Sequence, residues 1–113
     1  MTGSGLTAQA ERGMSAPPEV VFNTAIDPNR VDAWLPERLR DGSRRPEWDA
    51  KLTARWSVDG WSARLWVRPE TPGGALVCLE LVADGSDEAR LTDLAETTLA
   101  NLAREVADNL NAG

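Results

Sequence analysis

The sequence predicts an α+β fold in which a long C-terminal helix packs against an antiparallel β-sheet. Two patterns predict this architecture. Apolar residues recur at helical spacing between residues 91 and 110, as they do in an amphipathic helix. Upstream, apolar and polar residues alternate on both sides of Asp59-Gly60, which is typical of a β-hairpin. With 113 residues the chain has the length of one domain, and we expect residues 1–113 to form a single one.

An edge strand and a short helix are expected at the N-terminus. Residues 6–12 alternate weakly between apolar and polar side chains, as an edge strand does. Pro17 and Pro18 then suit the first turn of a helix, because proline has a fixed φ and lacks an N–H that this turn would leave unpaired. We expect this helix to continue to Ala25.

A second short helix is expected directly afterwards. Asp27 is a suitable N-cap, Pro28 would occupy the first helical position, and Pro36 would end the helix. Residues 37–50 contain several arginines and few apolar side chains, so we expect an irregular loop there, with a short strand near Trp48.

The hairpin is the strongest local prediction, because its turn and its pattern agree. A two-residue turn at Asp59-Gly60 pairs Val58 with Trp61, and this register places the apolar side chains of both strands on one face. A further strand is expected over residues 75–83. Its inward residues would be Ala75, Val77, Leu79 and Leu81, and its outward residues would be Leu76, Cys78 and Val82.

The C-terminal helix has a wide apolar arc and an acidic outer side. Ser86 is expected to cap it, followed by Asp87 and Glu88 in the first turn, where the helix dipole favours carboxylates. Its apolar face would comprise Leu91, Leu94, Ala95, Leu99, Leu102, Ala103, Val106 and Leu110. Residues 80–113 hold eight carboxylates and two arginines, which accounts for the whole net charge of −6. Such a surface disfavours nucleic acids and anionic membranes as partners.

Residues 16–36, APPEVVFNTAIDPNRVDAWLP, resemble the N-terminal signature of the START-like SRPBCC superfamily. That superfamily includes polyketide cyclase/dehydrase-like proteins and the birch-pollen-allergen fold. Residues 99–110, LANLAREVADNL, also resemble its final helix. The matching signature residues are Pro17, Pro18, Val21, Phe22, Asp27, Pro28 and Trp34. The resemblance implies a helix-grip fold, with a sheet around the last helix and two short helices after the first strand. Members of the superfamily are commonly longer, with about seven strands, whereas the pattern of this chain predicts four to five, so we expect a shortened member.

The resemblance also implies a small hydrophobic ligand held between the sheet and the C-terminal helix. Five tryptophans are unusual beside one phenylalanine and no tyrosine, and three of them belong to the expected inner faces. The residues expected to line the pocket are Trp34, Trp56, Trp61, Leu65, Leu99 and Leu102. The alternative is that these large side chains only fill a small core.

A second functional interpretation concerns the outer face of the sheet. Alternation places Trp66 there beside Arg64 and Arg68, and Leu76 and Val82 would lie on the same face. These apolar residues predict one of two arrangements. They form an interface, for example of a homodimer, or they are scattered surface side chains of a monomer. If they form an interface, the chain is a non-catalytic interaction module that has lost the ligand pocket between sheet and helix. Basic residues beside a tryptophan can also bind phosphate or single-stranded nucleic acid, but the acidic chain favours a solvated face. The basic residues in question are Lys51, Arg55, Arg64 and Arg68.

The sequence contains no catalytic constellation. It has no histidine, which removes the usual general base and metal ligand, and therefore leaves Cys78 without a partner for thiol catalysis. Glu47 and Asp49 could form a carboxylate pair or simply be neighbouring surface acids. A polyketide cyclase-like enzyme remains the third alternative, but it requires an inward polar group that the pattern does not supply. The sequence therefore favours a non-catalytic protein over an enzyme, and it predicts no metal and no cofactor.

The compartment expected is the cytoplasm of a bacterium. The N-terminus lacks a signal peptide, no apolar run is long enough to span a bilayer, and one cysteine cannot form an intrachain disulfide. Lys51 is the only lysine beside many arginines, which is typical of GC-rich bacterial genomes.

Overall fold

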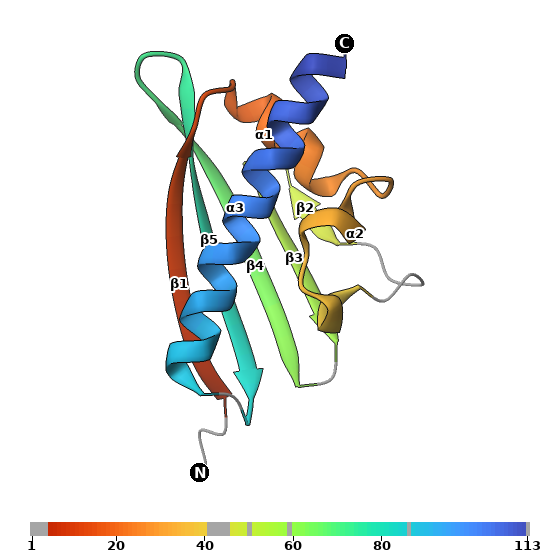
Figure 1. Cartoon of the computed structure of the whole chain (residues 1–113), viewed down its shortest axis with the longest axis vertical. Coiled ribbons are helices and arrows are strands. Elements are labelled where there is room, and N and C mark those ends of the chain that lie inside the picture. Colours follow the sequence, from red (N-terminus) through yellow and green to blue (C-terminus); the bar gives the residue numbers. More distant parts are fainter. Residues whose placement is uncertain (1–4, 41–45, 50, 59, 86, 113) are drawn as a thin grey trace.

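The computed structural model describes residues 5–40, 46–49, 51–58, 60–85 and 87–112, and within them five strands form one antiparallel sheet (Figure 1). The strand order is β1-β5-β4-β3-β2. The strands are β1 (Gly5–Met14), β2 (Glu47–Asp49), β3 (Thr53–Val58), β4 (Trp61–Glu70) and β5 (Gly74–Asp84). The helices are α1 (Pro18–Ile26), α2 (Val31–Trp34), the 3-10 turn η1 (Glu37–Leu39) and α3 (Glu88–Ala112). This order confirms the α+β helix-grip architecture expected from the sequence.

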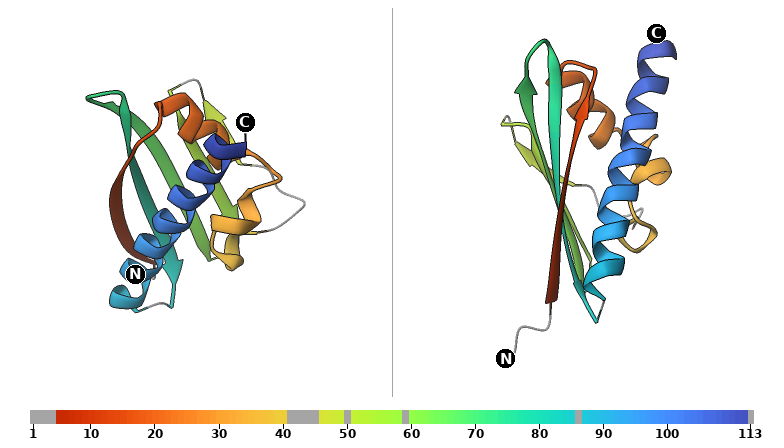
Figure 2. Two further views of the ribbon diagram at one scale, coloured as in Figure 1. Left: turned by 45° about the horizontal axis from the view of Figure 1, so that its top comes forward. Right: turned by 60° about the vertical axis from the view of Figure 1, so that its left-hand side comes forward.

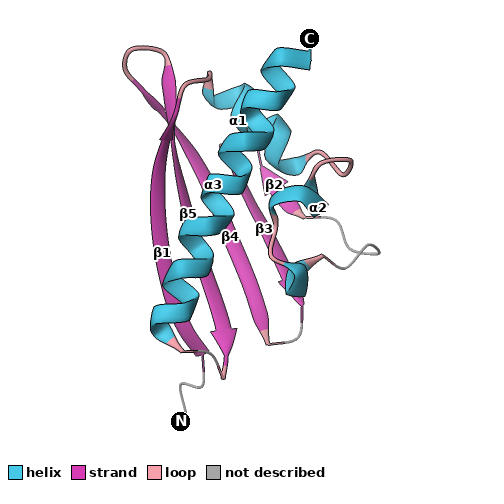
Figure 3. Ribbon diagram, viewed as in Figure 1, coloured by secondary structure: helices cyan, strands magenta, loops and turns pink. Residues whose placement is uncertain are grey.

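All the described helices lie on one face of the sheet, which we call the inner face, and none of them covers the other, outer face (Figures 2 and 3). The long α3 crosses the inner face obliquely, packing against β1 and β5 and touching α1 and α2. The core therefore lies between the sheet and α3, because apolar side chains of both layers are buried there. In the part of the chain that the structure describes, none of the helices has the length and apolar character that a membrane span needs.

The register of the β3–β4 hairpin is the predicted one. Val58 pairs with Trp61, and Trp56 pairs with Ala63. Gly60 has a φ of +79°, a left-handed conformation that glycine adopts without a steric penalty. Asp59, the other residue of the expected turn, lies outside the described residues.

Strand β5 lies between β1 and β4, and its two faces are as predicted. Its inward residues are fully buried, namely Ala75, Val77, Leu79 and Leu81. Of its outward residues, Leu76 and Val82 are half-buried, whereas Cys78 is buried by its neighbours on the outer face.

Helix α1 begins as expected, but α2 starts later than the sequence indicated. Pro18 occupies the first position of α1, whose N-cap is Pro17. The expected cap of the second helix, Asp27, instead accepts a hydrogen bond from the backbone N–H of Asn29 at 2.9 Å and so closes a turn. The helix begins only at Val31, and the prediction that Pro28 would be its first residue is wrong.

The short strand predicted near Trp48 is present as β2, which pairs with β3. It provides the fifth strand of the sheet, the upper end of the predicted four to five. Within the expected loop, residues 37–39 form the 3-10 turn η1, while residues 41–45 lie outside the described part.

The inner side of α3 is mostly the predicted one, with two differences. Leu110 was expected inside, but its side chain is 48% exposed because the last turns of α3 extend beyond the core. Thr98, which the apolar pattern omitted, is buried, and its hydroxyl donates to the carbonyl of Leu94 at 2.6 Å. At the N-terminus, Asp87 accepts hydrogen bonds from the backbone N–H groups of Ala89 and Arg90 and so caps the helix. Ser86, the predicted cap, lies outside the described residues.

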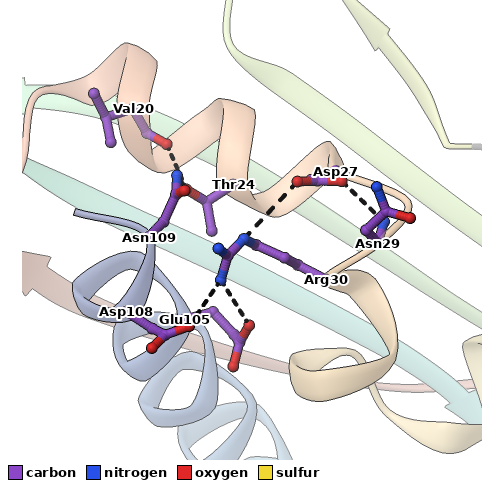
Figure 4. A network of polar contacts seen from close by, with 8 residues as sticks. All are labelled: Val20, Thr24, Asp27, Asn29, Arg30, Glu105, Asp108 and Asn109. Carbon is purple, nitrogen blue, oxygen red and sulfur yellow. Dashed lines mark hydrogen bonds and ion pairs between the residues drawn. The ribbon is translucent and has the colours of Figure 1, made fainter. Parts of the chain in front are cut away.

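A polar network joins α1 and α2 to the C-terminal half of α3 (Figure 4). The guanidinium of Arg30 lies 3.3 Å from both Glu105 and Asp108 and 3.9 Å from Asp27. Next to it, the side-chain amide of Asn109 donates to the hydroxyl of Thr24 at 3.1 Å. These contacts hold the C-terminal turns of α3, where Val106 is the last residue of the helix in the apolar core.

We expect Arg30→Ala to lower the free energy of unfolding by about 1–3 kcal/mol, more than an exposed ion pair contributes. The reason is burial, because the side chains of Arg30 and Glu105 are only 20% and 19% exposed, and the substitution leaves Glu105 facing two other carboxylates. Urea denaturation followed by circular dichroism measures the effect. Arg104→Ala, at an exposed position of α3, is the matched control and should change stability by less than about 0.5 kcal/mol. Equal effects of the two substitutions would contradict the prediction.

Candidate functional site

Most of the residues predicted to line a pocket lie in the packed core. Trp34, Trp56, Leu65, Leu99 and Leu102 are all buried, and they belong to one cluster of apolar side chains between the sheet and α3. The sixth, Trp61, is half-buried and packs against that cluster from its edge. The structure therefore gathers all six residues in or against one core, and their role in holding a ligand stays a prediction.

Two of these tryptophans form an aromatic pair beneath α2. The rings of Trp34 and Trp56 meet edge to face, with centroids 5.3 Å apart and an interplanar angle of 82°. The indole Nε1–H of Trp34 is buried and has no hydrogen-bond acceptor among the described residues. A buried donor without a partner is uncommon, because it loses its bond to water without replacing it.

A cleft opens where Trp61 reaches the edge of the core, and we call it the basal cleft. It lies between the start of β4 and the start of α3 and has a volume of about 440 Å³. Its lining consists of Trp61, Gly85, Asp87, Arg90, Leu91 and Leu94. Leu91 and Leu94 come from the inner side of α3, so the apolar part of the cleft is continuous with the core.

The polar side chains of the basal cleft belong to the first turn of α3. The carboxylate of Asp87 is already bonded to backbone N–H groups of that turn, whereas Arg90 places an exposed guanidinium at the rim. An apolar wall with one cationic rim group suits a molecule that has an apolar body and an anionic or hydrogen-bond-accepting end. Sequence reasoning placed Leu91 and Leu94 on the inner side of α3, but did not connect them with Arg90.

The outer face of the sheet bears a second hollow. A groove of about 450 Å³ is lined by Gln9, Ala10, Glu11, Trp66, Cys78 and Leu79. The guanidinium of Arg64 lies over the ring of Trp66, 4.7 Å from its centroid. The predicted interface residues Trp66, Leu76 and Val82 share this face, and all three are half-buried.

Cys78 lies at the floor of the outer groove in a state that disfavours reactivity. Its side chain is 2% exposed, and its thiol donates a hydrogen bond to the carboxylate of Glu11 at 3.4 Å. Burial first, and then the hydrogen bond to Glu11, raise the pKa of the Cys78 thiol above its ordinary value. The protonated form is therefore favoured, and the thiolate needed for nucleophilic chemistry is suppressed.

The acidic residues considered for catalysis remain at the surface. Glu47 and Asp49 are exposed on the short edge strand β2. Across the residues that the structure describes, no group of three histidine, cysteine or carboxylate side chains is arranged to hold a metal ion.

Comparison with known proteins identifies the fold through solved structures. No family model matches the sequence, and no curated protein does. The crystal structure of TTHA0849 from Thermus thermophilus superposes with a TM-score of 0.73 at 21% identity, covering 92% of this chain and 99% of that one. The AHSA1-like protein from Aeromonas hydrophila has a TM-score of 0.71 at 17% identity, covering 92% and 94%. The KanY protein has a TM-score of 0.69 at 15% identity, covering 90% and 97%. At these identities the likeness establishes a shared fold.

Proposed function

We propose that this chain, which has the helix-grip fold of the SRPBCC, START-like proteins, binds a small, mostly apolar molecule in the basal cleft. The observation that carries the proposal is the cleft itself, which lies between the sheet and the C-terminal helix and is walled by Trp61, Leu91 and Leu94. Its volume of about 440 Å³ falls within the range of small-molecule sites, which is about 300–1,000 Å³.

The proposed ligand has an apolar body and one polar end. Trp61 and Leu94 are half-buried and therefore have apolar surface that a ligand could cover. Arg90 at the rim would pair with an anionic end, since its guanidinium is exposed and has a fixed positive charge. The remaining predicted residues, Trp34, Trp56, Leu65, Leu99 and Leu102, would form the packed wall behind the ligand.

Two related fluorescent probes test the proposal. 1-Anilinonaphthalene-8-sulfonate has an apolar ring system with an anionic sulfonate, and N-phenyl-1-naphthylamine is the same ring system without the charge. We expect the native protein to bind both saturably. Arg90→Ala should weaken the sulfonate about tenfold, which corresponds to the loss of one charge-assisted contact, and leave the neutral probe unaffected. Leu94→Gln should weaken both probes.

Leu110→Gln supplies the matched control, because Leu110 is an exposed leucine of the same helix that does not line the cleft. It should leave both affinities unchanged. Circular dichroism must show each variant folded, since loosely packed states bind such probes without a specific site. Binding that is absent from the native protein, or that is equally strong after Leu94→Gln, would exclude the basal cleft as the site.

A further inference from the structure

The outer face of the sheet is the second feature that the fold leaves exposed. No described helix covers it (Figure 2). Its side chains stand in rows across the strands, because residues paired in neighbouring strands point to the same side. One row contains Gln9, Glu80, Arg64, Arg55 and Glu47, and the next contains Glu11, Cys78, Trp66, Thr53 and Asp49.

The charges on the outer face separate into two halves. The half formed by β1 and β5 has two carboxylates, Glu11 and Glu80. The half formed by β4 and β3 has three arginines, Arg55, Arg64 and Arg68, and one carboxylate, Glu70, at the end of β4. Beyond β3, the short edge strand β2 adds the carboxylates Glu47 and Asp49. The boundary between the halves runs between β5 and β4, parallel to the strands.

An apolar strip lies along that boundary. Trp66 of β4 is paired with Cys78 of β5, and Leu76 is the next outward residue of β5 on one side of Cys78. On the other side, Glu80 lies between Cys78 and Val82. Trp66, Leu76 and Val82 are only half-buried, so they retain apolar surface that an additional layer would cover. On these four strands, apolar residues thus lie along the boundary, with Glu11 and Glu80 on one side of it and the three arginines, together with Glu70, on the other.

We propose that a second copy of this chain packs on the outer face, related by a two-fold axis that runs along the boundary between β5 and β4. Such an axis places β5 over β4 of the second copy and β1 over its β3. Glu80 then faces Arg64 of the second copy, and Trp66 faces Cys78 of the second copy. Both contacts occur twice, as in an isologous dimer, and the strands of the two sheets stay roughly aligned, as in a β-sandwich.

The charge distribution favours a second copy over other partners. The chain has a net charge of −6, and residues 80–113 account for all of it, so two copies repel each other most strongly where their α3 helices approach. The outer face escapes this repulsion because its arginines oppose the carboxylates of the other copy. A nucleic acid would meet Glu11 and Glu80 on the same face, and the acidic chain as a whole would repel it.

The expected dimer is modest in affinity. Four strands spaced about 4.8 Å apart, with four rows of outward residues, present roughly 500 Å² per copy, or about 1,000 Å² in total. That area lies at the lower end of specific interfaces, where association is transient. We therefore expect dimers at concentrations of tens to hundreds of micromolar, and weaker association in high salt because the charged contacts are screened.

Sedimentation velocity over a concentration series up to about 1 mM, with two charge-reversal variants, tests the dimer. Arg64→Glu places two carboxylates opposite each other, and Glu80→Arg places two arginines opposite each other, so each variant alone should remain monomeric. An equimolar mixture should recover the dimer, because each heterodimer contains one native pair and one reversed pair. Arg104→Glu, an exposed reversal on α3, should dimerise like the wild type.

Several outcomes would overturn the inference. A wild-type chain that stays monomeric throughout the series would do so, and so would a mixture that fails to associate although both variants are folded. Arg64 is exposed, so Arg64→Glu remains informative even where Glu80→Arg fails to fold. A monomer that instead binds a single-stranded oligonucleotide through Arg64 would assign the face to another partner.

Discussion

Leu99→Ala is expected to lower the free energy of unfolding by about 2–5 kcal/mol. Leu99 lies on the inner side of α3 and is 1% exposed, so its truncation both reduces the apolar surface buried on folding and leaves a cavity under the helix. A domain of this size has a total stability of about 5–15 kcal/mol. The variant should therefore unfold at a clearly lower urea concentration, with the transition followed by far-ultraviolet circular dichroism.

The control for this experiment is the same substitution further along the same helix. Leu110 is 48% exposed, so Leu110→Ala should change the stability by less than about 0.5 kcal/mol. Both substitutions introduce alanine into α3, and the change in helix propensity is therefore the same. Similar losses for both would mean that α3 is stabilised by its own helicity and not by the sheet beneath it.

The β3–β4 hairpin and strand β5 were predictable because the apolar pattern of each leaves one register. In β3 and β4, the two-residue turn and the apolar alternation independently place Trp56 and Ala63 side by side, as observed. In β5, the position of Glu80 was enough to separate the outward residues from the inward ones. A shift by one residue would expose every buried side chain of these strands, so the pattern leaves one solution.

Helix ends were harder to predict, because one residue type can serve two structures. An aspartate can cap a helix or close a turn by accepting the N–H two residues ahead. Asp87 does the first and Asp27 does the second, whereas the sequence predicted Asp27 as a cap and Asp87 as a residue of the first turn. The choice depends on where the following segment packs, and this information is not local.

The inner side of α3 shows a second limit of pattern reasoning. Hydropathy alone omits Thr98, because its hydroxyl is polar, yet the bond to the carbonyl of Leu94 lets it be buried. Hydropathy also includes Leu110, because it cannot tell where the opposing layer ends. The Arg30 network escaped prediction for a similar reason, since Arg30 and Glu105 are separated by most of the chain.

The sequence predicted which apolar residues lie inside the fold better than it predicted where a cleft forms. Trp34 and Trp56 were expected among the inner residues, and both lie in the core, where their rings meet edge to face. The cleft, however, forms at the edge of that core, where Trp61 meets the first turns of α3. Its rim residue, Arg90, is one exposed charge among many in the sequence, because only the folded chain brings it beside Trp61.

Trp34→Ala is expected to cost about 3–5 kcal/mol, the second large effect. Trp34 is 1% exposed, and its loss removes one of the largest buried side chains together with the edge-to-face contact to Trp56. Trp34→Phe separates two contributions. It keeps most of the ring volume but deletes the buried Nε1–H, whose lack of an acceptor among the described residues costs about 1–3 kcal/mol. That relief should offset the lost area and leave Trp34→Phe close to the wild type.

Urea denaturation of both variants, beside Trp48→Ala, measures these contributions. Trp48 is 60% exposed on the edge strand, so the same change from tryptophan to alanine should cost much less there, limited to its contact with the ring of Phe22. If Trp34→Phe is nearly as destabilising as Trp34→Ala, the indole N–H contributes a favourable bond in solution. A bound water or ligand would then accept a hydrogen bond from the indole N–H of Trp34. The space beneath α2 would in that case contain a polar group and would not be purely apolar.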